Sequence, residues 1–290
     1  MGSATRSLDP RALPFTHAME GPCNPGEFRL RKLGAARRRN GSRPRLAVTT
    51  GEPRWTVPSF PEGLHGFTTD HPQTLVWIAA MAAVLFVSAG TVNWPAAWVF
   101  LAEMGGFGVA IGLWLARRDP ALLAERLSTG FQAAQKTWDK VFMATVFVLW
   151  TSWLVLMALD AVRFGWSRMP IWAQAIGAIL IALCMYVACL TFRENSYAAP
   201  VVKIASERGH RVVSSGPYAY VRHPMYAGAL LFFIGAPLLL GSWYGLAVAP
   251  ALIAVLAARA VMEERMLADE LPGYRDYATR VRCRLIPGLW

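Results

Sequence analysis

The segment Gly216-Pro-Tyr-Ala-Tyr-Val-Arg-His-Pro-Met-Tyr-Ala-Gly228 leads into an apolar run, and a second apolar run ends with Arg259-Ala-Val-Met-Glu-Glu264. As helices rising about 1.5 Å per residue, residues 224–240 and 243–261 would be about 26 and 28 Å long. A proline suits the first turn of such a helix, and Gly241-Ser242 between the runs suits a turn. We therefore predict a helical hairpin that brings the polar residues at its two ends to the same face of a membrane.

The composition indicates a polytopic membrane protein. Of the 290 residues, 55% are hydrophobic and 16% are charged, and the mean hydropathy is +0.34, which is too apolar for a soluble domain of this size. Four further apolar runs each have about the twenty residues that cross a hydrocarbon core: residues 73–92, 96–115, 141–159 and 171–192. Because lipid offers no partners to backbone polar groups, each run should be helical. The sequence thus predicts an all-α, polytopic transmembrane protein of about six spans.

The net charge of +11 has a topological interpretation. Basic residues gather in segments 1–70, 116–140 and 193–222 and again after residue 258, with apolar runs between them. Lys and Arg accumulate on the cytoplasmic side of membranes, where the leaflet is anionic. We therefore expect these segments and both termini to be cytoplasmic and in contact with membrane lipids. Nucleic-acid binding is disfavoured, because the arginine run at 37–39 has neither interleaved aromatic residues nor a fold signature.

Three regions differ in character. Residues 1–70 are rich in Pro, Gly, Arg and Ser without a sustained apolar period, so we expect a disordered or loosely attached basic region. Residues 71–193 would form four transmembrane helices, and residues 194–290 would hold the hairpin, a cofactor-binding region and a C-terminal tail. The four Cys and five His residues show no metal-ligand spacing such as HExxH, so we expect no protein-bound metal.

The two ends of the hairpin carry groups that suit S-adenosylmethionine. This molecule has a carboxylate, an ammonium, a sulfonium and an adenine. A donor such as His223 suits the carboxylate, Glu263 suits the ammonium, and the ring of Tyr218 or Tyr226 suits the adenine or the sulfonium. Backbone groups of residues 210–213 could bind the adenine edge. The sequence therefore predicts a cofactor pocket at the cytoplasmic face.

Spacing on the second helix of the hairpin orients its charged residues. Arg259 and Glu263 are four residues apart and should share one side of the helix, whereas Glu264, about 100° further round, should point elsewhere or into the following loop. A structural interpretation of these residues is also open. Arg222 and His223 could bind lipid phosphate, the tyrosines could be interfacial aromatics, and Glu263 could pair with Arg259 to steady a helix end.

The same residues belong to a longer pattern. Gly216-Pro-Tyr-x-x-Val-Arg-His-Pro-x-Tyr-x-Gly228 is followed by Glu263-Glu264, by Tyr274-x-x-Tyr277-x-x-x-Val281 and by Arg284-Leu-Ile-Pro287-Gly288. Over the C-terminal third of the chain, this pattern resembles the isoprenylcysteine carboxyl methyltransferase family of integral membrane methyltransferases. The Arg-His-Pro-x-Tyr element alone also occurs in phospholipid methyltransferases and in some membrane isoprenoid or sterol reductases.

The resemblance implies S-adenosylmethionine as the cofactor and assigns roles by position. Together with the donor Arg222, the expected cofactor-binding residues are His210, Arg211, Val212, Val213, Tyr218, His223, Pro224, Met225, Tyr226 and Glu263. The family's substrate arginine falls on Arg259. Lys203 stands where eukaryotic members have an uncharged polar cofactor contact. The tail Arg284-Leu-Ile-Pro departs from the eukaryotic ending, so the lipid substrate can differ while the cofactor stays the same.

We expect in-line methyl transfer from the sulfonium to a lipophilic acceptor that enters from the bilayer. A carboxylate acceptor is already ionised at neutral pH and needs no general base, so orientation and removal of water would suffice. Arg259 would hold that carboxylate and Glu263 the amino end of the cofactor, which makes these two residues the catalytic candidates. An amine or phenol would need a base, and no buried His or Asp stands out in the sequence.

Three other functions stay open at this point: N-methylation of phospholipids or other small lipids, an NADPH-dependent membrane reductase, and a non-catalytic membrane scaffold. Arg greatly outnumbers Lys, which suggests a GC-rich bacterial genome and hence a cytoplasmic-membrane location. In a bacterium we do not expect a prenylated protein as the natural substrate.

Overall fold

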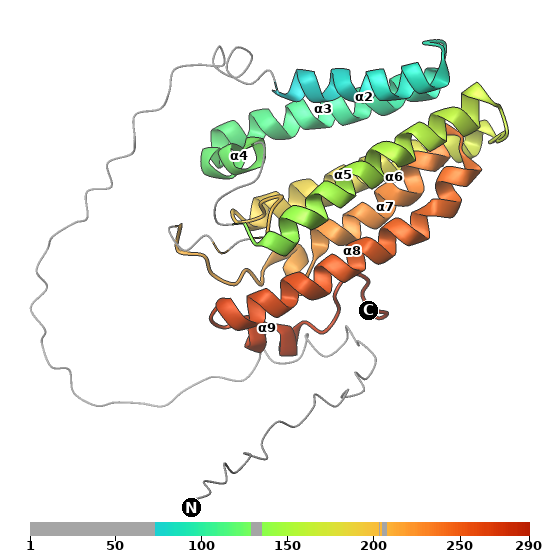
Figure 1. The fold of residues 1–290 in the computed structure, drawn as a ribbon. Helices are drawn as coiled ribbons and strands as arrows, with labels where there is room; N and C mark the ends of the chain where they lie inside the picture. The colour runs from blue at the N-terminus through green and yellow to red at the C-terminus, as the bar shows by residue number, and fades with distance from the viewer. Residues whose placement is uncertain (1–72, 129–134, 203, 205–207) are drawn as a thin grey trace, which may run out of the picture.

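The computed structural model describes residues 73–128, 135–202, 204 and 208–290. The basic N-terminal region and Lys203 therefore lie outside the described residues. The described chain is helical and contains no strand. Figure 1 shows its long helices running side by side in a bundle. The predicted all-α fold is confirmed.

Long and short helices are interspersed along the described chain. They are α2 (Gln73–Ala89), α3 (Pro95–Arg118), α4 (Pro120–Leu127), α5 (Thr137–Ala158) with its π-helical continuation η2 (Leu159–Arg163), α6 (Ile171–Glu194), the 3-10 helix η4 (Gly216–Ala219), α7 (Pro224–Leu240), α8 (Trp243–Glu270) and α9 (Tyr274–Arg280).

All six predicted apolar helices are present. Four of them, namely α3, α5 with η2, α6 and α8, are long and apolar enough to cross a membrane, whereas α2 and α7 have 17 residues each. The number of six crossings stays a prediction. The second hairpin helix was expected to end at residue 261 but continues to Glu270. The short helices α4 and α9 were not predicted.

Two glycines let α6 and α7 lie in direct backbone contact. A Cβ atom added to Gly235 would lie 2.8 Å from the carbonyl oxygen of Gly177, and one added to Gly177 would lie 2.9 Å from Cα of Leu239. Both distances are shorter than a carbon side chain tolerates. This contact fixes α7, and with it the first half of the hairpin, against the preceding helix.

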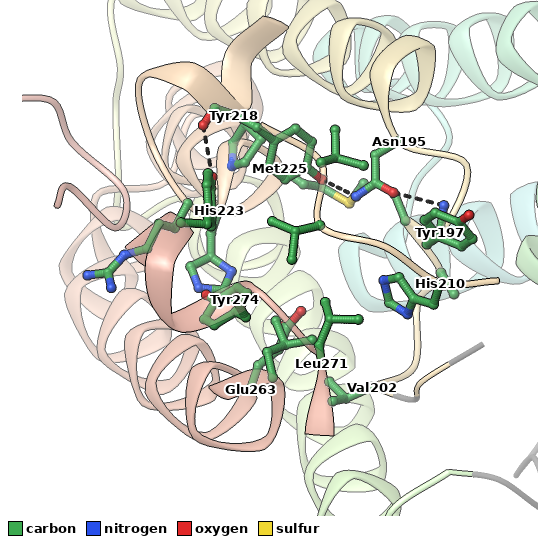
Figure 2. A pocket seen from close by; sticks show the side chains of 18 of the residues that line it. Asn195, Tyr197, Val202, His210, Tyr218, His223, Met225, Glu263, Leu271 and Tyr274 are labelled. Carbon is green, nitrogen blue, oxygen red and sulfur yellow. Dashed lines mark hydrogen bonds between the residues drawn. The ribbon is translucent and has the colours of Figure 1, made fainter. Parts of the chain in front are cut away.

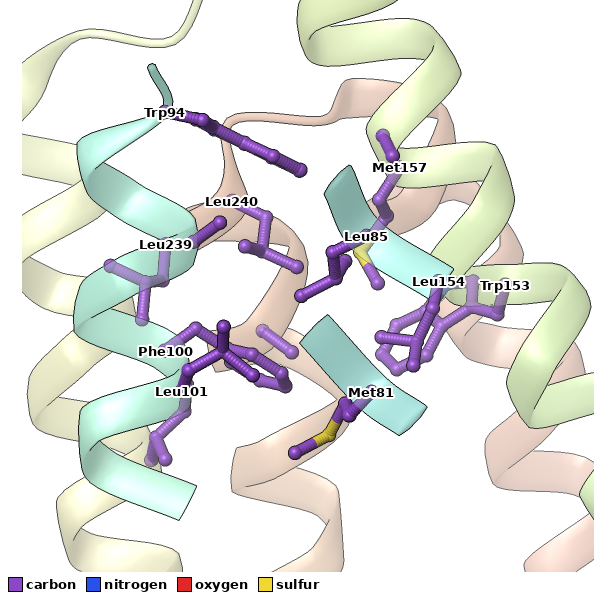
Figure 3. Close-up of a cluster of buried hydrophobic side chains, with 14 of the residues drawn as sticks. Met81, Leu85, Trp94, Phe100, Leu101, Trp153, Leu154, Met157, Leu239 and Leu240 are labelled. Atoms are coloured by element: carbon purple, nitrogen blue, oxygen red, sulfur yellow. The ribbon is translucent and has the colours of Figure 1, made fainter. Parts of the chain in front are cut away.

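The main core lies among α2, α3, α5 and α7 (Figure 3). Leu85, Phe100, Met157 and Leu240 are fully buried there. Trp153 of α5 is also buried and donates its indole N–H to the carbonyl oxygen of Gly245, at 2.8 Å. A buried indole N–H needs such a partner, so this bond ties α5 to the second hairpin helix.

A buried carboxylate closes the end of the bundle that holds the hairpin turn. Asp160 in η2 is 0% exposed, and its Oδ2 accepts hydrogen bonds from the hydroxyls of Ser167 and Ser242, both at 2.6 Å, and from the backbone N–H of Tyr244 at 3.3 Å. Ser242 in turn caps α8 by accepting from Gly245 N. One side chain therefore joins α5, the loop after it and the hairpin turn.

Candidate functional site

A pocket lies at the opposite end of the bundle, where α7 begins and α8 ends. Its walls come from residues 195–202 and 210–213, from η4, from the start of α7 with the two residues before it, from the last turns of α8 and from α9 (Figure 2). All eleven residues expected at a cofactor line it: His210, Arg211, Val212, Val213, Tyr218, Arg222, His223, Pro224, Met225, Tyr226 and Glu263.

Tyr226 and Glu263 join the two helices of the hairpin inside this pocket. The Tyr226 hydroxyl donates to Oε2 of Glu263 at 2.6 Å. The ring of Tyr226 lies parallel to the ring of His223, with centroids 5.2 Å apart and an interplanar angle of 5°. The predicted meeting of the two sequence-distant polar clusters is therefore present in the structure. A carboxylate and a flat aromatic surface stand next to each other in the same cavity.

Glu264 points to a different side of α8 from Glu263, as its position about 100° further round the helix predicts. It is 8% exposed, and it contacts His223 Nε2 at 3.1 Å and Arg284 Nε at 3.0 Å. Arg222 Nε also lies 3.1 Å from Oε1, an ion pair by distance but too poorly aligned for a hydrogen bond. Its partners were not predicted, because His223 and Arg284 of the tail come to this side of α8 only in the folded chain.

The C-terminal tail holds the segment just before α7. The backbone N–H groups of Arg222 and His223 donate to the carbonyl oxygens of Cys283 and Arg284, both at 3.0 Å. The Arg222 side chain also donates to the carbonyl oxygen of Arg282 at 3.0 Å. These bonds and Glu264 fix both side chains, so Arg222 and His223 line the pocket as parts of a rigid wall.

A second wall of the pocket was not predicted. The Tyr197 ring stacks on His210, with centroids 4.4 Å apart, and the Tyr197 hydroxyl donates to the carbonyl oxygen of Gly209 at 3.1 Å. Asn195 donates to the Tyr218 hydroxyl at 2.7 Å. Residues 195 and 197 directly follow α6, and nothing in their local sequence signals these contacts. The other lining residues missed are Ala198, Ala199, Val201, Val202, Met266, Leu267, Leu271, Tyr274 and Tyr277.

Burial sets the protonation of two pocket residues. It lowers the pKa of His210, and the charge of Arg208 lowers it further, against an opposing effect of Glu263. Burial likewise raises the pKa of the Tyr218 hydroxyl above its usual range. At neutral pH both groups are therefore uncharged. The His210 ring is then a flat, neutral surface with one N–H donor and one acceptor nitrogen.

Arg259, the expected substrate arginine, lies behind the pocket wall and does not line the cavity. It is buried, with its guanidinium carbon 5.8 Å from the centroid of the Tyr226 ring. Its carboxylate partner is Asp139 of α5, at 3.1 Å, and not Glu263. The structural interpretation in which Arg259 and Glu263 pair at the helix end is therefore wrong. Asp139 itself was missed, although an acidic residue at the start of an apolar helix is a recognisable signal.

Metal ligation finds no support in the described part of the chain. Across residues 73–128, 135–202, 204 and 208–290, no group of three or more His, Cys, Asp or Glu side chains is arranged to hold a metal ion.

The part of the chain that builds most of this pocket is similar to known proteins. Residues 172–271 match the family model of phospholipid methyltransferases. This part of the chain is thus similar to phospholipid methyltransferases. The match runs from α6 to the end of α8 and includes Tyr226, Arg259 and Glu263. The predicted resemblance to this group of membrane methyltransferases is confirmed.

Two relatives extend the comparison. Protein-S-isoprenylcysteine O-methyltransferase of Schizosaccharomyces pombe is 24% identical over 159 residues, 49% of this chain and 64% of the relative. The cobalt-zinc-cadmium resistance protein CzcN of Cupriavidus metallidurans is 29% identical over 128 residues, 44% of this chain and 57% of the relative. The matches therefore span about three fifths of each relative's length.

Proposed function

We propose that this protein is an S-adenosylmethionine-dependent membrane methyltransferase that acts on a lipophilic acceptor bearing a carboxylate. One observation carries the proposal: the hairpin joins Tyr226 and Glu263 at 2.6 Å inside a pocket lined by all the expected cofactor residues. The relationship of residues 172–271 to methyltransferases supports it. In this proposal the pocket and both termini face the cytoplasm, as the distribution of basic residues suggests.

The residues present fit the chemistry of the methyl donor. S-adenosylmethionine would supply a methyl group on a positively charged sulfur. Glu263 would bind its ammonium by a charge-assisted hydrogen bond, and the rings of Tyr197 and Tyr226 would offer π faces to its adenine or its positive charge. Backbone groups of residues 210–213, which line the pocket, would bind the adenine edge.

Arg259 would bind the acceptor carboxylate. Its Nε is buried and forms no hydrogen bond within the described chain, and a buried donor without a partner costs free energy. An acceptor carboxylate that reaches Arg259 past the pocket wall would satisfy this donor. Because a carboxylate is ionised at neutral pH, the protein would contribute orientation and exclusion of water rather than proton transfer.

N-methylation of a lipid amine is the second candidate, favoured by the match to the phospholipid methyltransferase model. An ammonium must lose a proton before it can accept a methyl group. The sequence showed no buried base, but the structure buries both His223 and Asp139. Either group could act as a base for an amine acceptor, so the preference for a carboxylate rests on Arg259.

The acceptor can be identified with trideuteromethyl-labelled S-adenosylmethionine. Purified protein is supplied with this donor and with lipid extracts and small lipophilic acids, and labelled products are found by mass spectrometry. We expect a labelled methyl ester, which mild alkali cleaves to labelled methanol. A label that survives alkali would show N-methylation instead. Transfer to no acceptor, combined with acceptor-dependent loss of NADPH absorbance, would favour a reductase and contradict the proposal.

The protonation of His210 predicts how donor binding responds to acid. Its pKa is lowered from the usual value of about 6.5, so it gains a positive charge only below that pH. This charge would repel S-adenosylmethionine, which carries a net positive charge in the same pocket. We expect affinity to fall as the pH drops from about 7 to 5, and the fall to be smaller in His210→Gln. Identical pH profiles for the two proteins, measured by calorimetric titration, would refute this role.

A further inference from the structure

Asp139 is a buried carboxylate that methyl transfer, as proposed above, does not use. It lies in the first turn of α5 and is 0% exposed. Its Oδ1 is 3.1 Å from Nη2 of Arg259, and its Oδ2 accepts from Gln135 Nε2 and from the backbone N–H of Val202, both at 2.9 Å. Residue 139 is outside the segment that matches the methyltransferase model. An element outside that segment thus supplies a charge next to the pocket.

Arg259 is held from several directions at once. Besides its contact with Asp139, Nη2 donates to the carbonyl oxygen of Pro200 at 2.7 Å, so both hydrogens on this nitrogen are used. The guanidinium carbon lies 5.3 Å from the centroid of Phe142 and 5.8 Å from that of Tyr226. These contacts keep the cation at the α5 side of α8.

Glu263 is the competing carboxylate for this cation. It is one helical turn beyond Arg259 on α8, a spacing at which an arginine and a glutamate can pair. In the described chain no ion pair of 4.0 Å or less joins them. Glu263 instead accepts from the Tyr226 hydroxyl at 2.6 Å. Arg259 can pair with either of two carboxylates, Asp139 or Glu263. Which of the two it pairs with decides whether the Glu263 charge is available inside the pocket.

We propose that Asp139 is a positioning residue that holds Arg259 away from Glu263 and so keeps the Glu263 charge free for the amino group of the methyl donor. The proposal rests on the proposed function, because it takes Glu263 as a contact of that donor. Without the Asp139 charge, Arg259 would be a buried cation without a carboxylate partner, a costly arrangement. The guanidinium would turn to Glu263, and the donor's ammonium would lose its partner.

A purely structural role for Asp139 makes a different prediction. Asp139 also fixes the pocket wall through Val202 N. If that bond were the whole contribution of Asp139, an Asp139 variant would lose affinity for S-adenosylhomocysteine, and the additional removal of Arg259 would not restore that affinity. The two roles are therefore separated by the behaviour of the double variant.

The experiment is a double-mutant cycle on S-adenosylhomocysteine binding, measured by calorimetry on purified protein in detergent. We expect Asp139→Asn to raise Kd at least about tenfold, and the double variant with Arg259→Met to return to within about threefold of the wild type. Asp139→Glu keeps the charge and should stay within about threefold as well. As a control, Asp160→Asn changes the buried Asp at the other end of the same helical segment and should lower the thermal stability without a change in Kd.

The proposal would be overturned by wild-type affinity in Asp139→Asn, or by a double variant that binds as weakly as Asp139→Asn. Equal losses in Asp139→Glu and Asp139→Asn would also contradict it. The wild type reports separately on the proposed function in the same titration. If the wild type fails to bind S-adenosylhomocysteine, the methyltransferase proposal itself is refuted. If the wild type binds, the affinities of the Asp139 variants test the positioning role alone.

Discussion

Replacing Glu263 with glutamine is expected to weaken S-adenosylhomocysteine binding at least about tenfold, because a hydrogen bond to a charged group contributes about 1.5–3 kcal/mol. The substitution keeps the size of the side chain and a partner for the Tyr226 hydroxyl, but it removes the charge that would bind the amino group of the ligand. Methyl transfer should fall at least as much, since the donor is then both poorly bound and poorly oriented. Calorimetric titration and transfer of labelled methyl groups measure the two effects.

Glu270→Gln is the matched control for this prediction. Glu270 is on the same helix and forms an exposed pair with Lys136, and such surface pairs contribute about 0–1 kcal/mol. It should bind the ligand like the wild type. Undiminished binding by Glu263→Gln would defeat the assignment of this pocket, and so would undiminished binding by Tyr226→Ala.

Asp160→Ala is expected to produce the largest loss of stability, about 3–5 kcal/mol. It leaves the hydroxyls of Ser167 and Ser242 and the backbone N–H of Tyr244 without their buried acceptor, and each unsatisfied buried group costs about 1–3 kcal/mol. The free energy of unfolding in detergent, or the midpoint of thermal unfolding, reports the change.

The control for Asp160→Ala is Asp269→Ala. Asp269 pairs with Arg275 on the exposed surface, where both side chains are about 70% accessible, so its removal should change stability by less than about 0.5 kcal/mol. Equal stability of the two variants would show that the Asp160 cluster does not hold the hairpin turn. Ligand affinity should be unchanged in a folded Asp160 variant, because the cluster holds the hairpin turn at Ser242, whereas the pocket lies where α7 begins and α8 ends.

The hairpin could be predicted because its signals are local. A proline starts α7, Gly241-Ser242 forms the turn, and the two apolar runs have similar lengths. Once two helices of similar length run out and back, their polar ends must meet, whatever the rest of the fold does. The contact between Tyr226 and Glu263 follows from this geometry, whereas residues 210–213 and Tyr218, outside the hairpin, were assigned to the cofactor by the resemblance.

Contacts made by distant segments could not be predicted in the same way. The angle of Glu264 on an isolated helix separates it from Glu263, but it does not give its partners, His223 and Arg284 of the tail. Asp139 has no local feature that names Arg259 as its partner, since 120 residues separate them in sequence. The backbone contact of Gly177 with Gly235 likewise exists only after α6 and α7 pack. Each needs a tertiary arrangement that periodicity and composition do not encode.

The pocket depends on residues outside the segment that matches the methyltransferase model. The hairpin and the last turn of α6 lie within residues 172–271, but the tail at 282–284 holds the segment before α7 and Asp139 holds Arg259. We therefore expect a fragment restricted to the matched segment to lack the fixed arrangement of charges that the full chain provides.

The most direct test of the central claim is an experimental structure of the full chain with S-adenosylhomocysteine bound. The account predicts the ligand in the pocket of Figure 2, with its amino group about 3 Å from Glu263 and its adenine beside residues 210–213. A ligand bound elsewhere, or Tyr226 and Glu263 on opposite sides of the membrane, would contradict it.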